Sequence, residues 1–429
     1  MLEYPGRPEG VDPHPDALVK MYDIQVITPI FGGGVKAGEN DPLTLIRPSS
    51  IRGHLRFWWR TIRGTKFETA ERLRLREGEI WGTTESPSNV IVEVSIRSIG
   101  STYPCAYTPE GKSFPRFEKN HPSYALFPFQ GNKKDGTPIA KCTSNISFIL
   151  KLTCPRDIAS DMEAAIWAWT NFGGIGARTR RGCGALYCKE LSPSDKNSIR
   201  FWYESRLKSF GAVMSNECEW PILPEGFLVR DNRIADVLQN WSEVIGLMQT
   251  FRQGQNVGRN PGTGQNRPGR SRWPEPETIR EASSSRSTRH PRIAAIPDDA
   301  FPRAEFGLPL VFHFKDVGDP KDTELYPVIS GREKTRMSSP LIIRPMICAD
   351  GSVLQIILRL KTDSPEEVIL RKAPKNPLFK KISDPGLATY PKSPMGSSGP
   401  GKPVRSPSGS AIEAFISFAK EKGNDFVEV

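Results

Sequence analysis

The glycine- and arginine-rich stretch 171–186 has the residue types best suited to chemistry. It reads Asn-Phe-Gly-Gly-Ile-Gly-Ala-Arg-Thr-Arg-Arg-Gly-Cys-Gly-Ala-Leu. Glycine permits positive φ and lets another chain approach closely, and arginine offers planar, permanently charged donors that suit phosphate. Together they predict a segment that lies against a polyanion. The candidate binding residues are Gly173, Gly174, Gly176, Arg178, Arg180 and Arg181.

This stretch differs from the known nucleotide-binding loops. The phosphate loop of nucleotide hydrolases is Gly-x-x-x-x-Gly-Lys-Ser/Thr, but Gly176 and Gly182 have the wrong spacing and Cys183 stands where the lysine is required. The dinucleotide fingerprint follows a strand, whereas this loop follows a predicted helix. An extended anion such as an RNA strand therefore fits better than ATP or NAD. A helix cap with a surface turn is the alternative, although five glycines exceed what one cap needs.

A second group of cations lies at 47–63, Arg-Pro-Ser-Ser-Ile-Arg-Gly-His-Leu-Arg-Phe-Trp-Trp-Arg-Thr-Ile-Arg. Pro48 and two serines indicate a helix start. At about 100° per residue, the apolar residues fall on one side and four arginines on another. Arginines without interleaved acids repel one another, which favours a phosphate partner over a solvated basic face. The candidate contacts are Arg52, Arg56, Arg60 and Arg63.

Two other side chains of this helix are candidates with a simpler alternative. Trp59 lies at the edge of the apolar stripe, where it could stack on a base, a contact typically worth about 1–3 kcal/mol. A buried core tryptophan is the simpler role. His54 flanks the stripe and is included among the RNA-binding candidates.

The totals favour a nucleic-acid partner without defining the fold. The 429 residues hold 59 Lys and Arg against 48 Asp and Glu, a net charge of +11 and a pI of about 9.3. Such an excess indicates nucleic acid or an anionic surface. Seven scattered cysteines without a Cys-x-x-Cys pair argue against a disulfide framework or a zinc cage. The sequence has no signal peptide and no run of about 18 uncharged apolar residues, so a cytoplasmic protein without a membrane span is expected.

The first half predicts a recurrent order of elements. Strands are expected at 22–31, 89–97, 146–152 and 185–189, an extended segment at 43–46, and helices at 48–63 and 160–172, the second opened by a capping box at Ser160 and Glu163. Residues 1–20 read as an unstructured arm and 98–145 as a long insertion. Strand, helix, strand, strand, helix, strand is the ferredoxin-like order of RNA-recognition domains. In that fold both arginine groups could meet one RNA strand.

The second half predicts a more irregular α+β unit. Helices are expected at 194–210, 233–251 and 411–420, and strands at 309–314, 341–347, 353–360 and 425–429. Residues 251–290 carry little apolar content and are expected to be disordered in isolation. Residues 373–409 read as a Pro/Ser/Gly-rich loop. The fold class is therefore α+β.

Several of these stretches together resemble a known family. The sequence resembles the RAMP superfamily, the repeat-associated proteins of CRISPR systems, whose mark is a glycine-rich loop before the last strand of a ferredoxin-like domain. It is most similar to the family of first-numbered subunits of the type III-B Cmr effector complex. The residues that carry the resemblance are 47–60, 173–184, 269–280, 301–309 and 336–345.

The resemblance implies two tandem ferredoxin-like (RRM-like, βαββαβ) domains with long loop insertions, residues 1–195 and 196–429. It implies a non-enzymatic RNA-binding subunit that caps the complex near the 3′ end of the guide RNA. The implied partners are guide RNA, target RNA and other Cmr RAMP subunits, with no metal and no small-molecule cofactor. The further RNA contacts that it implies are Arg270, Arg272, Arg280 and Arg336.

One enzymatic alternative stays open. Some RAMP relatives cleave RNA without metal through a histidine that acts as general acid or base, and His54 is the candidate here, although a lone histidine beside an apolar stripe is more often structural. Metal-dependent cleavage would need clustered carboxylates. Only Glu39 and Asp41 lie close together near the first loop.

Overall fold

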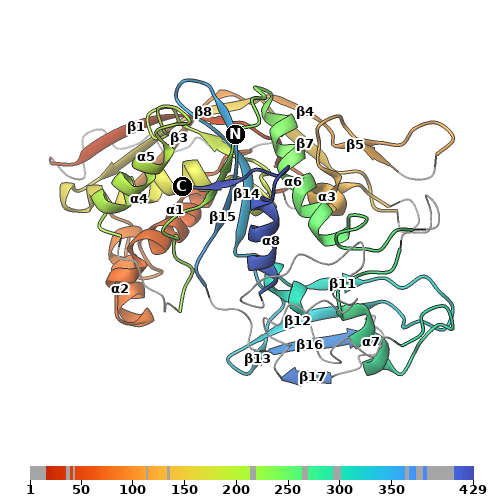
Figure 1. Ribbon diagram of the computed structural model, residues 1–429. Helices are drawn as coiled ribbons and strands as arrows, with labels where there is room; N and C mark the ends of the chain where they lie inside the picture. The colour runs from red at the N-terminus through yellow and green to blue at the C-terminus, as the bar shows by residue number, and fades with distance from the viewer. Residues whose placement is uncertain are drawn as a thin grey trace, which may run out of the picture.

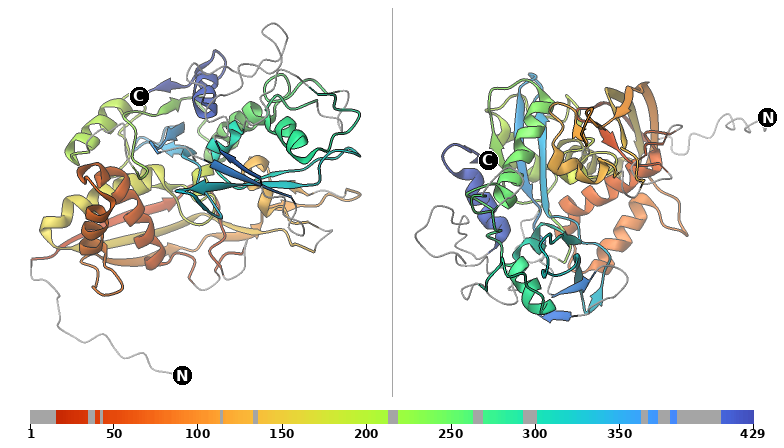
Figure 2. Two further views of the ribbon diagram at one scale, coloured as in Figure 1. Left: turned by 90° about the horizontal axis from the view of Figure 1, so that it is seen from below. Right: turned by 90° about the vertical axis from the view of Figure 1, so that its right-hand side faces the viewer.

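The computed structural model describes residues 16–34, 39–41, 44–112, 115–132, 136–212, 219–262, 269–292, 301–362, 367–372, 380–383 and 410–429. These residues form an α+β fold with two four-stranded antiparallel sheets, a third sheet of five strands and two smaller sheets. The third sheet and helix α7 (Glu275–Ser283) form a separate lobe, at the bottom of Figure 1 and of the right panel of Figure 2. No helix in the described part of the chain combines the length and apolar character that a membrane span needs.

The first sheet follows the predicted order of elements. Residues Tyr22, Ile24 and Val26 of one strand alternate inward because side chains of a strand point to opposite faces in turn. Helices α1 (Pro48–Arg63) and α4 (Ala159–Phe172) cover this inner face. The strands, in their spatial order, are β3 (Ile91–Ser98), β8 (Ile146–Cys154), β1 (Leu18–Val26) and β9 (Leu186–Tyr187).

The second sheet repeats this arrangement. The chain order is strand, helix, strand, strand, helix, strand, with helices α6 (Val237–Gln253) and α8 (Ala411–Lys420). The strands, in their spatial order, are β14 (Leu341–Ile347), β15 (Val353–Arg359), β10 (Leu228–Arg230) and β18 (Val427–Glu428). Both sheets therefore have the same spatial order: the second, third, first and fourth strand of the unit.

The third sheet is built from two insertions into the second unit. One insertion lies between α6 and β14, and the other between β15 and α8. The sheet joins strands from both, which is why neither insertion shows the sheet by itself. Its strands are β11 (Leu310–Phe312), β12 (Thr323–Ile329), β16 (Glu367–Lys372) and β17 (Lys380–Ser383), with β13 (Arg332–Glu333) paired to β12.

Both faces of the second sheet are buried. Leu341 and Ile343 of β14 pack with α6 and α8, whereas Ile342 and Met346 belong to the core that contains α4 and α5 (Ile199–Ser209). Strands β14 and β15 are therefore buried over almost their whole length instead of alternating between buried and exposed residues. One hydrophobic core consequently crosses position 195, where the sequence analysis divides the chain.

The first unit is the first sheet with α1 and α4, and the second unit is the second sheet with α6 and α8. A fully buried arginine connects the two units through hydrogen bonds. Arg344 of β14 lies on the face that packs against α4 and has no exposed surface. It donates to the carbonyl oxygens of Gly173 at 2.7 Å and Thr170 at 3.2 Å, and also to those of Leu186 and Pro345. Burial lowers the pKa of Arg344 to about 9, so the guanidinium stays charged at neutral pH.

Some local predictions are wrong. Helix α4 begins at Ala159, and its N-cap makes no side-chain bond, so the predicted capping box does not form. Strand β1 begins at Leu18, inside the predicted arm, of which residues 1–15 lie outside the described residues. Helix α2 (Ala70–Trp81) was not predicted at all.

The expected insertions are also more structured than predicted. The 98–145 insertion forms β4 (Ser101–Pro104) and β7 (Lys141–Ser144), which pair in one sheet with β2 (Ile30–Phe31), and also β5 (Ala106–Tyr107), β6 (Arg116–Phe117) and α3 (Ser123–Leu126). The described parts of 251–290 are ordered and contain α7. Much of the predicted loop 373–409, and part of the extended segment 43–46, lie outside the described residues; the described part of the latter is not a strand.

We predict that Arg344→Ala lowers the free energy of unfolding by about 3 kcal/mol or more. The substitution leaves a cavity and several buried carbonyl oxygens without donors, each of which costs about 1–3 kcal/mol. Urea unfolding followed by circular dichroism measures the change. The matched control is Arg200→Ala, because Arg200 is exposed and binds one carbonyl oxygen, that of Glu428. A loss below about 1 kcal/mol for Arg344→Ala would show that the buried bonds do not hold the two units together.

Candidate nucleic-acid interface

The glycine loop is the segment 173–184, and its glycines permit close packing within the protein. Gly176 has φ +86°, and a Cβ there would lie 2.6 Å from the carbonyl oxygen of Phe31. A Cβ at Gly184, with φ +59°, would lie 1.9 Å from the carbonyl oxygen of Ile175. Such distances are impossible for real Cβ atoms, so only glycine lets the loop lie against β2 and turn into β9.

The loop amides are used internally as well. The amide of Ala177 donates to Phe31 O at 2.7 Å, and that of Ile175 donates to Gly184 O at 2.9 Å. Gly173 and Gly174 are buried, and only Gly176 of the three predicted glycine contacts is exposed. The prediction that Gly173 and Gly174 contact RNA is therefore wrong, because their surfaces are covered by the protein itself.

Two loop arginines connect the loop to its neighbours. Arg181 donates to Leu341 O at 2.9 Å and to Ser339 Oγ at 3.0 Å. Arg180 donates to Ser339 O, and its guanidinium carbon lies 5.4 Å from the centre of the Phe57 ring of α1. Burial lowers the pKa of each arginine to about 10. These contacts bring α1, the loop and the segment before β14 to one place.

The third loop arginine, Arg178, makes no such contacts with neighbouring elements. Arg178 is exposed, and its side chain has no hydrogen-bond or ion-pair partner among the described residues. Its φ of +59° is in the left-handed region, which costs a residue with a side chain roughly 1–2 kcal/mol. Strain of this kind is concentrated at functional sites. The position therefore holds a free cation in a conformation that glycine would adopt more easily.

The arginines of α1 fall into three groups. Arg56 and Arg60 donate to the same oxygen of Glu77 of α2, at 2.6 and 2.5 Å, so two cations share one carboxylate. Arg52 has no partner among the described residues. Arg63 is buried and binds Asp161 at 3.0 Å. Arg63 is thus a structural residue, and its prediction as an RNA contact is wrong.

The remaining candidates of α1 are structural or uncharged. Trp59 is fully buried and donates to Asp161 Oδ1 at 2.9 Å, so the core role is correct and base stacking is excluded. His54 is half-buried and stacks on Trp169 with ring centres 6.0 Å apart. Burial lowers the pKa of His54, so its ring is neutral at pH 7. Its ring nitrogens have no hydrogen-bond partner in the described chain.

A glycine occupies the exposed centre of α1. Gly53 is exposed, and a Cβ there would meet nothing within 4 Å. Glycine inside a helix costs about 1 kcal/mol relative to alanine, and no packing contact explains it here. Arg52 and Arg56 lie on one side of Gly53, and Phe57 with its Arg180 contact lies on the other. Gly53 leaves this part of the helix surface flat.

Three arginines predicted from the second half are structural. Arg272 is 1% exposed and donates to Asn260 Oδ1 at 2.9 Å. Arg280 is buried and binds both oxygens of Asp319, at 2.9 and 2.8 Å, and also Glu277. Arg270 binds Glu277. The prediction that Arg270, Arg272 and Arg280 contact RNA is wrong because carboxylates and carbonyl groups of the lobe already occupy their donors.

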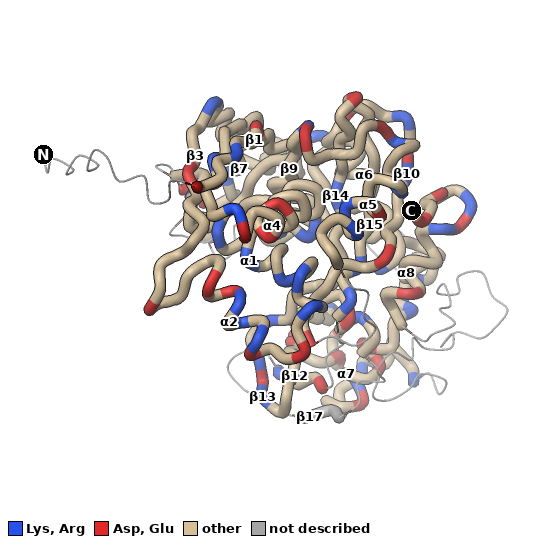
Figure 3. The backbone as a smooth tube through the Cα atoms, turned by 90° about the vertical axis from the view of Figure 1, so that its left-hand side faces the viewer, with Lys and Arg blue, Asp and Glu red and all other residues tan. Residues whose placement is uncertain are grey.

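Arg336 is different from those three. It is exposed and has no side-chain partner in the described chain. It lies three residues before Ser339, which accepts the bonds of Arg180 and Arg181. On the face shown in Figure 3, Lys and Arg positions gather on α1 and α2 and again around β13. The structure therefore keeps Arg52, Arg178 and Arg336 as free cations from three segments.

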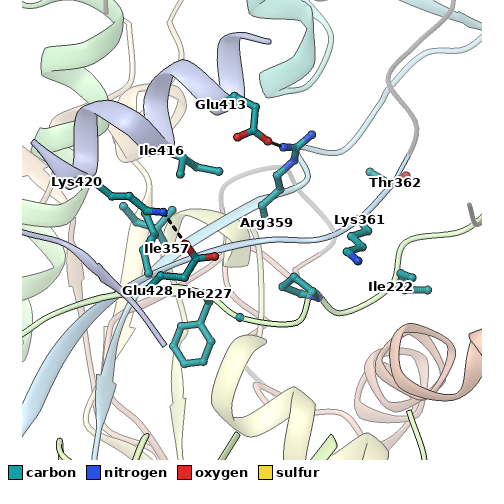
Figure 4. Close-up of a pocket in the computed structure, with 13 residues that line it drawn as sticks. Ile222, Phe227, Ile357, Arg359, Lys361, Thr362, Glu413, Ile416, Lys420 and Glu428 are labelled. Carbon is teal, nitrogen blue, oxygen red and sulfur yellow. Dashed lines mark hydrogen bonds and ion pairs between the residues drawn. The ribbon is translucent and has the colours of Figure 1, made fainter. Parts of the chain in front are cut away.

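A separate cavity carries balanced charge. A hollow of about 470 Å³ lies between β15, α8 and the segment before β10. Arg359 pairs with Glu413 there, and Lys420 pairs with Glu428 at 2.6 Å (Figure 4). Because each cation has an acid, this cavity offers no excess positive charge to an anion.

One group of side chains has the composition of a metal site. His290, Asp316 and Asp319 place one ligand atom each within 4.8 Å of one another. However, Arg280 already binds both oxygens of Asp319, and Arg289 binds Asp316 at 3.2 Å. The carboxylates thus serve ion pairs. The sequence does not indicate this group, because folding alone brings residues 290 and 316–319 together.

Comparisons with known proteins agree with this geometry. Residues 23–187 match the family model described as the RAMP superfamily. The matched residues span most of the first sheet together with α1, α4 and the glycine loop.

More particular similarities lie within CRISPR systems. The chain is 27% identical over 183 residues to the Cmr subunit Cmr1-2 of Pyrococcus furiosus, a match that covers 40% of this chain and 95% of that relative. It is 26% identical over 143 residues to Cmr1-1 of the same organism, covering 33% and 40%.

Solved structures give weaker similarities. The crystal structure of apo Cmr1 from Pyrococcus furiosus has a TM-score of 0.46 and 14% identity, with 86% of this chain and 99% of that chain covered. A subunit of type III-B Cmr-beta bound to cognate target RNA has a TM-score of 0.45 and 13% identity, with coverages of 80% and 94%.

We predict that the ion pairs of the lobe make the protein sensitive to acid. Burial raises the pKa of Asp319, but bonds from Arg280 and the Ser287 amide outweigh burial and lower it below 3.8. The stabilisation is present above the unfolded pKa and is lost as pH falls through the folded pKa. Asp319→Asn should therefore lower the free energy of unfolding by about 3 kcal/mol at neutral pH and by much less below about pH 3.

Urea unfolding at several pH values measures this difference. Asp322→Asn is the control, because Asp322 is exposed and binds only His313 at 2.8 Å. Equal destabilisation by Asp319→Asn at neutral and acid pH would contradict the charge-pair explanation. RNA binding by Asp319→Asn should equal that of the wild type, since the pair lies within the lobe.

Proposed function

We propose that the protein is an RNA-binding RAMP subunit of a type III-B Cmr ribonucleoprotein. The RAMP domain and the similarity to two Cmr1 subunits support this assignment. The single observation that carries the binding surface is that the segments of three unpaired arginines, Arg52, Arg178 and Arg336, are joined by the contacts of Arg180 with Phe57 and of Arg180 and Arg181 with Ser339. The proposed ligand is the ribose-phosphate backbone of single-stranded RNA.

The proposed binding does not depend on RNA sequence. Contacts to phosphate give affinity and position, whereas contacts to base edges give sequence preference. A surface of unpaired arginines provides contacts to phosphate. A subunit that accepts any guide sequence needs contacts of this kind. Arg56 and Arg60 add one net positive charge beside Arg52. The partners in this proposal are guide RNA, target RNA and other Cmr subunits, with a position near the guide 3′ end in the cytoplasm.

The proposal includes the domain organisation. The strand order supports two tandem ferredoxin-like domains, since each four-stranded sheet places the second, third, first and fourth strand of its unit side by side in that order. Division near residue 195 separates the two sets of six elements, with the third sheet as an insertion into the second. The buried contacts of Arg344 support a fixed relation between the two domains.

The proposed role is binding, without a cofactor and without catalysis. A metal-independent nuclease needs a group that exchanges protons at the scissile bond. His54 is neutral at pH 7, stacks on Trp169 and has no acidic partner in the described chain. This environment supports a packing role for His54 more than a general acid.

We predict that Arg52→Ala and Arg336→Ala each weaken binding of single-stranded RNA several-fold, whatever its sequence. Each lost phosphate contact should flatten the dependence of log K on log salt concentration by about 0.7. Fluorescence anisotropy with labelled uridine and mixed-sequence oligonucleotides over a salt series measures both effects. Arg72→Ala is the control, because Arg72 is exposed on α2 and pairs with Glu68.

Two outcomes would change this assignment. Wild-type affinity and salt dependence in both variants would remove the proposed surface. The labelled RNA should also stay intact with and without added metal. Cleavage that His54→Ala abolishes would replace the binding role with the nuclease alternative.

We also predict opposite effects of Gly53→Ala on stability and binding. Alanine should stabilise the helix by up to about 1 kcal/mol, because a Cβ there meets nothing within the protein. The same Cβ should weaken RNA binding if a backbone lies against this part of α1. Gly246→Ala is the matched control, since Gly246 is also helical with open space around it, in α6. Increased stability with unchanged binding would show that RNA does not approach Gly53.

A further inference from the structure

An arginine outside the predicted site lies over two aromatic rings. Arg252 belongs to the last turn of α6, and its guanidinium carbon lies 5.9 Å from the centre of the Tyr124 ring and 5.3 Å from that of Phe306. Its Nε is buried and has no hydrogen-bond partner among the described residues. Ring contacts hold the guanidinium in place without using its N–H donors. The donors of Arg252 are therefore held ready and unused.

The charge around Arg252 is not compensated. After burial, the groups that act most strongly on Arg181 are Tyr124, Arg178, Arg252 and Arg180, and the three arginines each lower its pKa. Burial lowers the pKa of Arg178, and neither Arg178 nor Arg252 has an ion-pair partner among the described residues. Arg280, by contrast, is buried with two acidic partners, Glu277 and Asp319. A partly buried group of cations without an acid is costly unless an anion joins it.

The third component is a phenol without a partner. Tyr124 of α3 packs its ring against the second hydrophobic core. Its hydroxyl makes no hydrogen bond with the described residues. A hydroxyl and two guanidinium groups together provide several donors at one place, which is the arrangement that phosphate oxygens require.

We propose that Arg252, Tyr124 and Arg178 form a phosphate-binding site for one backbone phosphate of a single-stranded RNA. The site joins the 98–145 insertion, the glycine loop and α6, so it extends the surface of Arg52 and Arg336 into the junction of the two units. The identity of the ligand rests on the proposed function. Phosphate is the common chemistry, and free inorganic phosphate is the other source that the experiment distinguishes.

The test uses the full chain and a fluorescein-labelled uridine decamer. Anisotropy titrations over a salt series compare the wild type with Arg252→Gln and Tyr124→Phe. Arg252→Gln should weaken binding about tenfold and flatten the salt slope by about 0.7, the value for one phosphate contact. Tyr124→Phe keeps the ring and should weaken binding about threefold, since a neutral hydrogen bond contributes less than a charged one.

A matched control has the same ring contact with a compensated charge. Arg371 lies 5.1 Å from the centre of the Tyr326 ring and pairs with Glu333. Arg371→Gln should leave both affinity and salt slope unchanged. The salt slope counts ionic contacts, and an unfolded fraction that circular dichroism shows to be constant over the salt series shifts every log K equally and leaves the slope unchanged.

The outcomes separate this site from the wider proposal. If Arg52→Ala and Arg336→Ala weaken binding but Arg252→Gln keeps the wild-type slope, the site is wrong and the proposed function stands. If none of these variants changes binding, both are wrong. If inorganic phosphate raises the melting temperature of the wild type but not of Arg252→Gln, while the RNA slopes of the two are equal, the site binds free phosphate and the RNA contact is overturned.

Discussion

The buried charge of Arg344 is the constraint on which the site depends. Its donors reach carbonyl groups at the end of α4 and on β9, the two elements that flank the glycine loop. Carbonyl groups at a helix C-terminus carry partial negative charge and favour a cation. The second unit thereby fixes both ends of a loop that belongs to the first. Neither unit could present the loop in this way without the other.

The fixed loop then decides which arginines are free. Arg180 and Arg181 donate to carbonyl and hydroxyl oxygens of Ser339 and Leu341, so they hold the loop against the start of β14. Arg178, two residues earlier, has no such acceptor among the residues that the structure describes. The same division holds in the lobe, where Glu277 and Asp319 occupy three arginines while Arg336 stays unpaired. Of the arginines predicted to bind RNA, Arg52, Arg178 and Arg336 therefore keep their donors free of partners among the described residues.

Local patterns predicted the elements well. Helix α1 at 48–63, helix α8 at 411–420 and strand β14 at 341–347 have the predicted bounds, because proline, periodicity and apolar runs are local signals. Helix α2 was missed since charged residues surround its apolar positions Leu73, Ile80 and Trp81. The third sheet was missed because its strands come from two separate insertions.

Partners were not predictable in the same way. An arginine looks the same in a sequence whether it binds phosphate or a carboxylate, and the acid that decides lies far along the chain. Glu77 is 21 residues from Arg56, and Asp319 is 39 residues from Arg280. Sequence reasoning therefore included Arg63, Arg272 and Arg280, which are buried, and left out Tyr124 and Arg252. Only the folded chain shows which donors have been used.

The loop also shows how glycine content should be interpreted. Its glycines meet protein atoms on the side where a Cβ would stand, so they explain the path of the loop and not its ligand. Arg178 differs from the glycines, because its position requires a left-handed conformation that glycine would adopt without strain, and yet an arginine stands there. A residue that keeps a costly conformation and an unpaired charge is held there for its side chain. In the proposed site, the backbone of the loop is the support and the guanidinium of Arg178 is the group that contacts the RNA.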